Sequence, residues 1–147
     1  MSCCNNTLKN PNYKSAVRAY NATAQPVVAA GTRLAILGQT CTDTGCALTA
    51  GTNAVTVNAK GLYYFSADVT LTSTAAGVAI VQLYNGTTAL PCAISQQSVA
   101  IGGIATLHVE TELYLNPCCN VAPQINIQAS GVAATVNWVG MTAEKRA

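Results

Sequence analysis

The segment 61–86 (GLYYFSADVTLTSTAAGVAIVQLYNG) constrains the fold more than any other part of the chain. Its first half alternates between two sets of side chains, and the apolar set is Tyr63, Phe65, Ala67, Val69 and Leu71. Because successive side chains of a strand point to opposite faces, this pattern predicts a strand with one buried and one wetter face. In residues 78–84, only Gln82 interrupts an apolar run. A strand with two apolar faces needs a partner on each, so we expect one face to meet another copy of the chain.

Similar short strands are expected along the rest of the sequence. They fall within 15–23, 25–38, 53–58, 88–100, 104–115, 124–129 and 135–142, the last with Val136 and Trp138 on one face. Turn-forming residues such as Gly45 and Asn85-Gly86 separate them. About ten strands and no convincing helix predict an all-β sandwich or jelly roll. We expect one such domain over residues 15–147, preceded by a polar N-terminal arm over residues 1–14.

The composition favours a structural protein that assembles with itself. Charged residues make up 8% of the 147 residues, against about 25% in a typical soluble domain. A weakly charged, β-rich surface is adhesive, and an oligomer buries part of it. The net charge of +2 is too small to indicate a nucleic-acid partner. We expect no membrane partner either, because no apolar run approaches the roughly 20 residues of a membrane span and the start lacks the pattern of a signal peptide.

The order of these segments resembles a known family. Residues 61–66 (GLYYFS) are similar to the central G-x-Y-x-F-S strand of the jelly rolls of tumour necrosis factor and the complement globular heads. The step from Tyr84-Asn85-Gly86 to Ala89-Leu90-Pro91 is similar to bacterial and phage versions, which include the head of collagen-like spore-surface glycoproteins. The late strands fit the closing pair of that fold, so the resemblance covers about residues 15–145.

The resemblance implies a TNF-like jelly-roll sandwich of about ten antiparallel strands that forms a tight trimer. In the family, apolar and aromatic residues line the threefold axis. By position, the candidates for the trimer interface are Tyr64, Val78, Ile80, Tyr84 and Tyr114. The chain has no collagen repeat and many cysteines, which makes an extracellular signalling role or a spore-surface role a poor fit.

These features lead to two functional hypotheses. In the first, the chain is a structural virion protein of a bacteriophage, made in the host bacterial cytoplasm. It would be a homotrimer that decorates the capsid or tops a fibre, with the N-terminal arm contacting the capsid or fibre protein. In the second, it is a fibre-tip or cell-surface adhesin whose loops bind host-surface glycans. The two hypotheses differ in whether loss of the arm abolishes attachment to the virion or leaves host binding intact.

Seven cysteines are many for a chain without a secretion signal. Free or buried thiols are the interpretation that we prefer, because cytosolic cysteines usually stay reduced. A disulfide between Cys41 and Cys46 across a turn is a second interpretation. A third is structural zinc held by Cys3, Cys4, Cys118 and Cys119, although the usual C-x2-C spacing is absent. We therefore expect no metal and no other cofactor.

The sequence offers little for catalysis, and we expect that the chain is not an enzyme. His108, Glu110 and Glu112 share one face of a strand, where their spacing suits either metal ligands or, as we prefer, a half-exposed polar face. His108 is the single histidine, and nothing marks a cysteine as an activated nucleophile. No phosphate-binding loop, dinucleotide fingerprint or G-x-S-x-G motif is present. Trp138 is expected to anchor the core or an interface.

Overall fold

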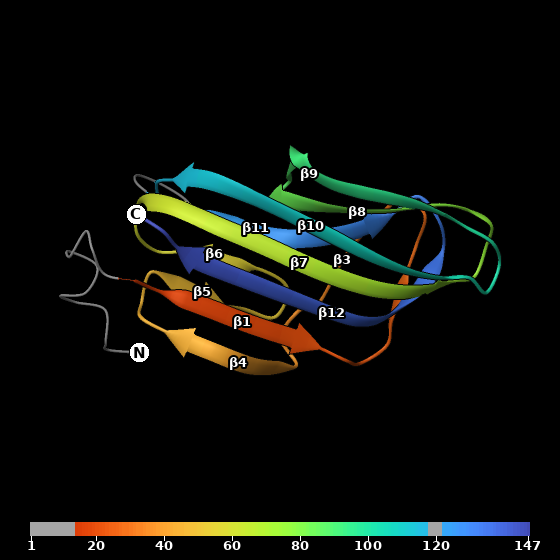
Figure 1. Cartoon of the computed structure of the whole chain (residues 1–147), viewed down its shortest axis with the longest axis horizontal. Helices are drawn as coiled ribbons and strands as arrows, with labels where there is room; N and C mark the ends of the chain where they lie inside the picture. Colours follow the sequence, from red (N-terminus) through yellow and green to blue (C-terminus); the bar gives the residue numbers. More distant parts are fainter. Residues whose placement is uncertain (1–13, 118–121) are drawn as a thin grey trace.

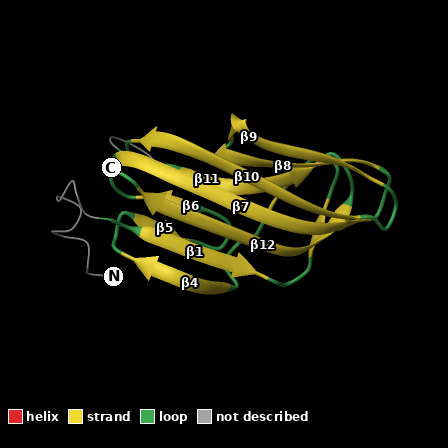
Figure 2. Ribbon diagram, viewed as in Figure 1, coloured by secondary structure: helices red, strands yellow, loops and turns green. Residues whose placement is uncertain are grey.

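A computed structural model describes residues 14–117 and 122–147. In this part of the chain, twelve strands form two antiparallel sheets that pack face to face (Figures 1 and 2). The expected all-β sandwich is confirmed. The strands beyond the expected ten are short pairings within residues 25–57, of two or three residues each.

Sheet A has the order β10-β7-β12-β1-β4, and β2 also pairs with β12. The bounds are β10 (Ile104–Leu115), β7 (Gly61–Ser73), β12 (Ala134–Lys145), β1 (Ala16–Asn21), β4 (Gln39–Thr44) and β2 (Gln25–Val27). Strands that are neighbours in this sheet are far apart in the sequence. The face of sheet A that points away from sheet B is called the outer face of sheet A below.

Sheet B has the order β5-β6-β11-β8-β9, and β3 pairs with β11. The bounds are β5 (Leu48–Ala50), β6 (Val55–Val57), β11 (Gln124–Ser130), β8 (Gly77–Asn85), β9 (Thr88–Val99) and β3 (Thr32–Arg33). Strands β9 and β10 are edge strands of the two sheets and lie against each other along one edge of the sandwich.

The core lies between the sheets and follows the expected alternation. In β7, each of Tyr63, Phe65, Ala67, Val69 and Leu71 is buried. Sheet B contributes buried aliphatic side chains in the same way: Val55, Val57, Val81, Leu83, Ile125 and Ile127. Their burial removes apolar surface from water at roughly 25 cal/mol per Å², which is the main stabilising contribution to a fold with few charges.

The register of β12 differs from the expected one at Asn137. Val136 pairs with Leu71 while Trp138 pairs with the adjacent Thr70, so Asn137 is the extra residue of a β-bulge. Val136 and Val139 therefore both face the core, at 0% exposure, and Trp138 lies on the outer face of sheet A. The prediction that Val136 and Trp138 share a face is wrong, because the bulge shifts the alternation by one residue.

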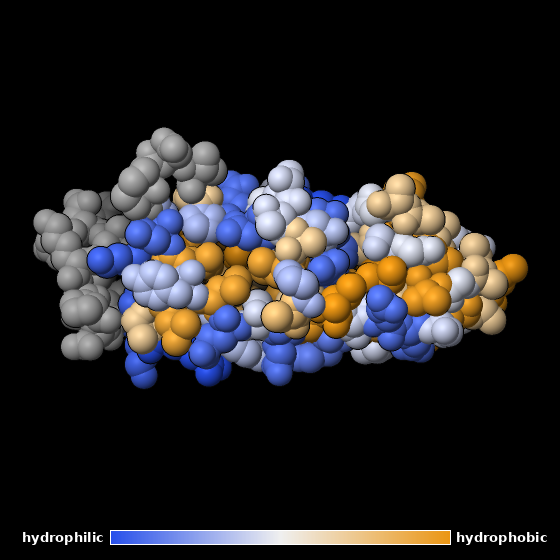
Figure 3. Space-filling model, turned by 90° about the horizontal axis from the view of Figure 1, so that it is seen from above, coloured by the Kyte–Doolittle hydropathy of each residue, from blue (hydrophilic) through white to orange (hydrophobic). Residues whose placement is uncertain are grey.

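The sandwich is elongated, and both ends of the described chain lie at the same end of it (Figure 1). Seen onto the edge formed by β9 and β10, apolar side chains gather along the edge and at the end remote from the termini (Figure 3). The exposed large hydrophobic residues in β9, β10 and their connection are Ile94, Ile101, Ile104 and Tyr114, and Ile101 is 75% exposed. The residues described contain no helix long and apolar enough to cross a membrane.

Candidate functional site on the outer face of sheet A

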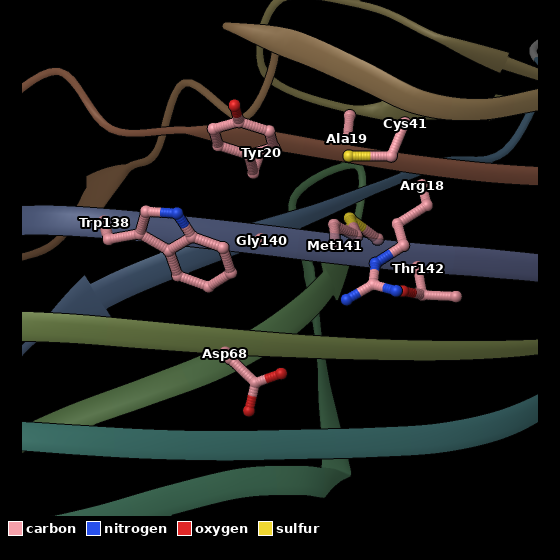
Figure 4. Close-up of a pocket in the computed structure, with 9 residues that line it drawn as sticks. All are labelled: Arg18, Ala19, Tyr20, Cys41, Asp68, Trp138, Gly140, Met141 and Thr142. Atoms are coloured by element: carbon pink, nitrogen blue, oxygen red, sulfur yellow. The ribbon is translucent and has the colours of Figure 1, made fainter.

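A shallow hollow of about 60 Å³ lies on the outer face of sheet A (Figure 4). Strands β1, β4, β7 and β12 line it with Arg18, Ala19, Tyr20, Cys41, Asp68, Trp138, Gly140, Met141 and Thr142. The hollow is therefore built across the middle of the sheet, from strands that are distant in the sequence.

Two aromatic rings form one wall of the hollow. Tyr20 and Trp138 stack with their ring centroids 6.0 Å apart and an interplanar angle of 20°. The indole extends along β12 over Gly140, where an added Cβ would lie 2.3 Å from the Trp138 ring. The missing side chain at Gly140 is what allows the indole to lie flat on the sheet. The hollow thus depends on the bulge and on this glycine together.

Polar side chains complete the hollow. Arg18 from β1 and Asp68 from β7 bring opposite charges to it, and Cys41 from β4 contributes a free thiol that is exposed. Aromatic residues, Met and Arg are enriched at the centres of protein–protein contacts, and Tyr20, Trp138 and Arg18 supply such groups here. This part of the surface is thus suited to binding a partner.

A polar cluster lies beside the hollow, with His108 at its centre. His108 on β10 is directly opposite Asp68 on β7. Its Nδ1 lies 2.8 Å from Asp68 Oδ1, and its Nε2 lies 3.4 Å from Glu110 Oε2. Both ring nitrogens therefore face carboxylate oxygens. Of these two contacts, the one to Asp68 has the distance of a strong hydrogen bond.

The cluster continues toward the end of the sheet that holds the termini. Tyr64 donates a hydrogen bond of 2.6 Å from its hydroxyl to Glu110 Oε2. The guanidinium of Arg146 lies over the Tyr64 ring, 4.3 Å from its centroid. Arg146 also pairs with Glu112 at 3.3 Å and with Glu144 at 3.1 Å. The result is one continuous network across β7, β10 and the end of β12.

These contacts shift pKa values in ways that follow from the geometry. The hydrogen bond to Asp68, helped by the one to Glu110, raises the pKa of His108 above its ordinary 6.5. The hydrogen bond from Tyr64, and then that from His108, lowers the pKa of Glu110 below 4.5. The Glu110 contact in turn raises the pKa of Tyr64 above 10.0. The cluster thus favours a protonated His108 next to ionised carboxylates.

The five candidate interface residues lie on both sides of the sandwich. Tyr64 and Tyr114 are on β7 and β10 and belong to the outer face of sheet A. Val78, Ile80 and Tyr84 are on β8, where they alternate with the buried Ala79, Val81 and Leu83 and so point outward from sheet B. The five residues therefore do not form one surface within a single chain, and their role in a trimer stays a prediction.

The cysteine predictions have mixed outcomes. Cys46 is disulfide-bonded, whereas Cys41 and Cys92 are free and exposed. The interpretation of a disulfide between Cys41 and Cys46 is therefore wrong, and the preferred interpretation of free or buried thiols holds for Cys41 and Cys92 but not for Cys46. Cys3, Cys4, Cys118 and Cys119, the candidate zinc ligands, lie outside the described residues. Within residues 14–117 and 122–147, no group of three or more His, Cys, Asp or Glu side chains is arranged to hold a metal ion.

The sequence showed part of this surface and missed the rest. His108, Glu110 and Glu112 were identified as one polar face, and the structure joins them to Asp68, Tyr64 and Arg146. Arg146, near the C-terminal end of the chain, bridges two glutamates, which the sequence did not indicate. Tyr20 and Gly140 were not singled out. Gly140 follows the only tryptophan by two residues. This spacing indicates a place for the indole only once the bulge at Asn137 is known, because the bulge puts Trp138 on the same face as Gly140.

Comparisons with known proteins show the fold. No family model matches the sequence, and neither does any curated protein. Solved structures do match. PRD1 vertex protein P5 has a TM-score of 0.65 and 14% identity, over 90% of this chain and 72% of that one.

Two further matches are similar in extent. The globular domain of zebrafish complement 1qA protein has a TM-score of 0.60 and 10% identity, over 88% of this chain and 94% of that one. The Eiger TNF of S. frugiperda has a TM-score of 0.60 and 11% identity, over 91% of this chain and 92% of that one. The chain therefore has a TNF-like jelly-roll fold, as the sequence resemblance implied.

Proposed function

We propose that the chain is a structural protein of a bacteriophage virion, where it forms a homotrimer that decorates the capsid. The observation that carries this proposal is the match to PRD1 vertex protein P5 over 90% of the chain. The TNF and complement matches support a trimer. The low charge and the adhesive, β-rich surface support a protein that works as part of an assembly.

The outer face of sheet A is the proposed interface of the trimer. It carries Tyr20, Tyr64, Tyr114 and Trp138, and aromatic side chains are enriched at the centres of protein interfaces. The outer face of sheet B, by contrast, has Tyr84 as its aromatic residue among those described. We therefore retain Tyr64 and Tyr114 as interface residues and propose that Val78, Ile80 and Tyr84 face away from the axis.

A closed ring of three identical chains needs two different surfaces that fit each other. The apolar edge formed by β9 and β10 is a suitable second surface (Figure 3). Its exposed Ile94, at 43%, would lose contact with water against the aromatic hollow of the next copy. The proposed arrangement is thus the edge of one sandwich against the outer face of sheet A of its neighbour.

The N-terminal arm is the proposed contact to the capsid. The domain begins with β1 at the end of the sandwich that holds both termini (Figure 1). An arm leaving from that end would bind the capsid while the opposite, uncharged end points outward.

The experiment is a binding assay with capsids that lack the protein. The full chain is expected to sediment with the capsids, and a variant without residues 2–13 is expected to remain in solution with its oligomeric mass unchanged. If the truncated variant binds capsids as well as the full chain does, the proposed role of the arm is wrong. If the full chain binds no capsid, the decoration role is wrong.

Glycan binding by an adhesin is a second candidate, favoured by the stacked Tyr20 and Trp138 beside Arg18 and Asp68. Sugar rings stack on such aromatic faces, and the flanking charges offer hydrogen bonds. The two candidates make different predictions for Trp138→Ala. In the adhesin, glycan binding is lost and the oligomer is unaffected; in the trimer proposed here, the oligomer is weakened.

A further inference from the structure

The outer face of sheet A gathers most of the acidic groups of a chain that has few. Of the five acidic residues in the sequence, four lie in the network described above, as does the single histidine. The four are Asp68, Glu110, Glu112 and Glu144, and Asp43 is the fifth. Because these acidic residues lie on the proposed interface, the net charge of the network would affect how tightly the copies bind one another.

The geometry around His108 distinguishes its two protonation states. A neutral imidazole has one N–H and can donate to one carboxylate, whereas an imidazolium donates from both nitrogens. Here Nδ1 faces Asp68 at 2.8 Å and Nε2 faces Glu110 at 3.4 Å. In the neutral state, one ring nitrogen therefore directs a lone pair toward a carboxylate oxygen. The imidazolium fits this arrangement of acceptors and the neutral ring does not.

The remaining charged groups around the cluster do not replace the histidine proton. On β10, Glu112 adds negative charge, and on β12 Glu144 does the same, while Arg146 is already paired with both. On β7, Tyr64 donates its hydroxyl hydrogen to Glu110. Across the hollow, β1 contributes Arg18 and β4 the Cys41 thiol. Strand β9, which packs along β10, carries no charged residue, and Cys92 is its one titratable group.

We propose that the Asp68–His108–Glu110 cluster makes self-assembly pH-dependent, with a tighter trimer when His108 is protonated and a looser one when it is neutral. This inference rests on the proposed use of the outer face of sheet A as the interface. With His108 neutral, the edge of the neighbouring copy would cover Asp68 and Glu110 without the proton that compensates their charges. In a contact that excludes water, such like charges repel more strongly than on an open surface.

The test measures the trimer–monomer equilibrium of the full chain by sedimentation equilibrium between pH 5.5 and 8.5 at constant ionic strength. The dissociation constant is expected to rise at least about tenfold from pH 6 to pH 8, since each linked proton changes an equilibrium constant by up to about tenfold per pH unit. His108→Gln is expected to be nearly independent of pH over this range and as weak as the wild type at pH 8.

A matched pair of variants separates this cluster from general effects of charge. Asp68→Asn removes the main partner of His108 and is expected to flatten the pH dependence. Asp43→Asn removes the acidic residue outside the network and is expected to keep the dependence of the wild type. Circular dichroism at each pH verifies that every variant remains folded.

The outcomes separate the two proposals. A trimer with the same dissociation constant at pH 6 and pH 8 would overturn the pH inference while leaving the trimer intact. A pH dependence that persists in His108→Gln would assign the effect to another group and also overturn it. A monomer at every pH would remove the trimer itself, and the pH inference with it.

Discussion

The indole of Trp138 lies over Gly140, two residues farther along the same strand. A Cβ at position 140 would lie 2.3 Å from the ring, and real carbon atoms do not approach so closely. The β-bulge at Asn137 turns the indole out of the core, and Gly140 provides the space in which it lies. The pair thus determines the shape of the hollow on the outer face of sheet A.

Gly140→Ala is expected to displace the indole and to destabilise the fold by about 1–3 kcal/mol, the usual cost of overpacking. Thermal unfolding measures the stability, and the fluorescence of the single tryptophan reports the displacement. The double variant with Trp138→Ala is the control, because removing the ring should relieve the clash. An equal penalty for Gly140→Ala in both backgrounds would show that the clash does not exist.

Asn126 is a buried polar residue whose loss should be costly. At 0% exposure, it donates to the carbonyl of Gly86 at 3.0 Å and to that of Gln124 at 3.3 Å. Asn126→Ala is expected to lower the free energy of unfolding by about 1–3 kcal/mol, because its two hydrogen bonds are lost, at about 0.5–1.5 kcal/mol each. The exposed Asn137→Ala should change it by less than about 0.5 kcal/mol. Denaturant titrations compare the two, and equal effects would contradict this assignment.

Tyr63 is expected to destabilise the fold when it ionises. Burial raises the pKa of its hydroxyl to about 12. The neutral form therefore stabilises the fold fully below pH 10, the ordinary value, and this contribution is lost as the pH rises from 10 toward 12. Tyr63→Phe should lose less stability than the wild type over this range in thermal unfolding. Parallel curves for the two proteins would show that Tyr63 does not contribute to alkaline unfolding.

The free thiols report on assembly. Cys41 lines the hollow and Cys92 lies on β9, and both are exposed in a single chain. If the hollow is covered in the trimer, a thiol reagent is expected to label Cys41 faster in dilute, dissociated protein than in concentrated protein. Mass spectrometry of peptides measures both rates. A Cys41 rate that does not depend on protein concentration would show that the hollow stays open.

The sequence predicted the parts of this fold that follow from local alternation. The strand around Tyr63 and Phe65 and the alternation that buries Ile125 and Ile127 needed only the two-residue period of a strand. The position of Trp138 could not be predicted in this way, because one bulge residue reverses the side to which it points. Likewise, Asp68 and His108 are 40 residues apart, and only the pairing of β7 with β10 places them together.

The candidate interface shows the same limit. Alternation correctly placed Tyr64 on the outward side of its strand, but it could not say that Tyr64 and Val78 belong to different sheets. That information is in the strand order, which depends on long-range pairing. The predicted interface set therefore contains residues from both outer faces, and on the outer face of sheet A aromatic residues line a hollow.

The most direct test of a trimer formed through the outer face of sheet A is the mass in solution of the full chain and of two matched variants. The wild type and Val78→Asp, which changes the outer face of sheet B, are predicted to have the mass of three chains. Tyr114→Asp, which changes the outer face of sheet A, is predicted to be a monomer that retains its fold. A monomeric wild type, or a trimer that Val78→Asp disrupts and Tyr114→Asp leaves intact, would contradict the account.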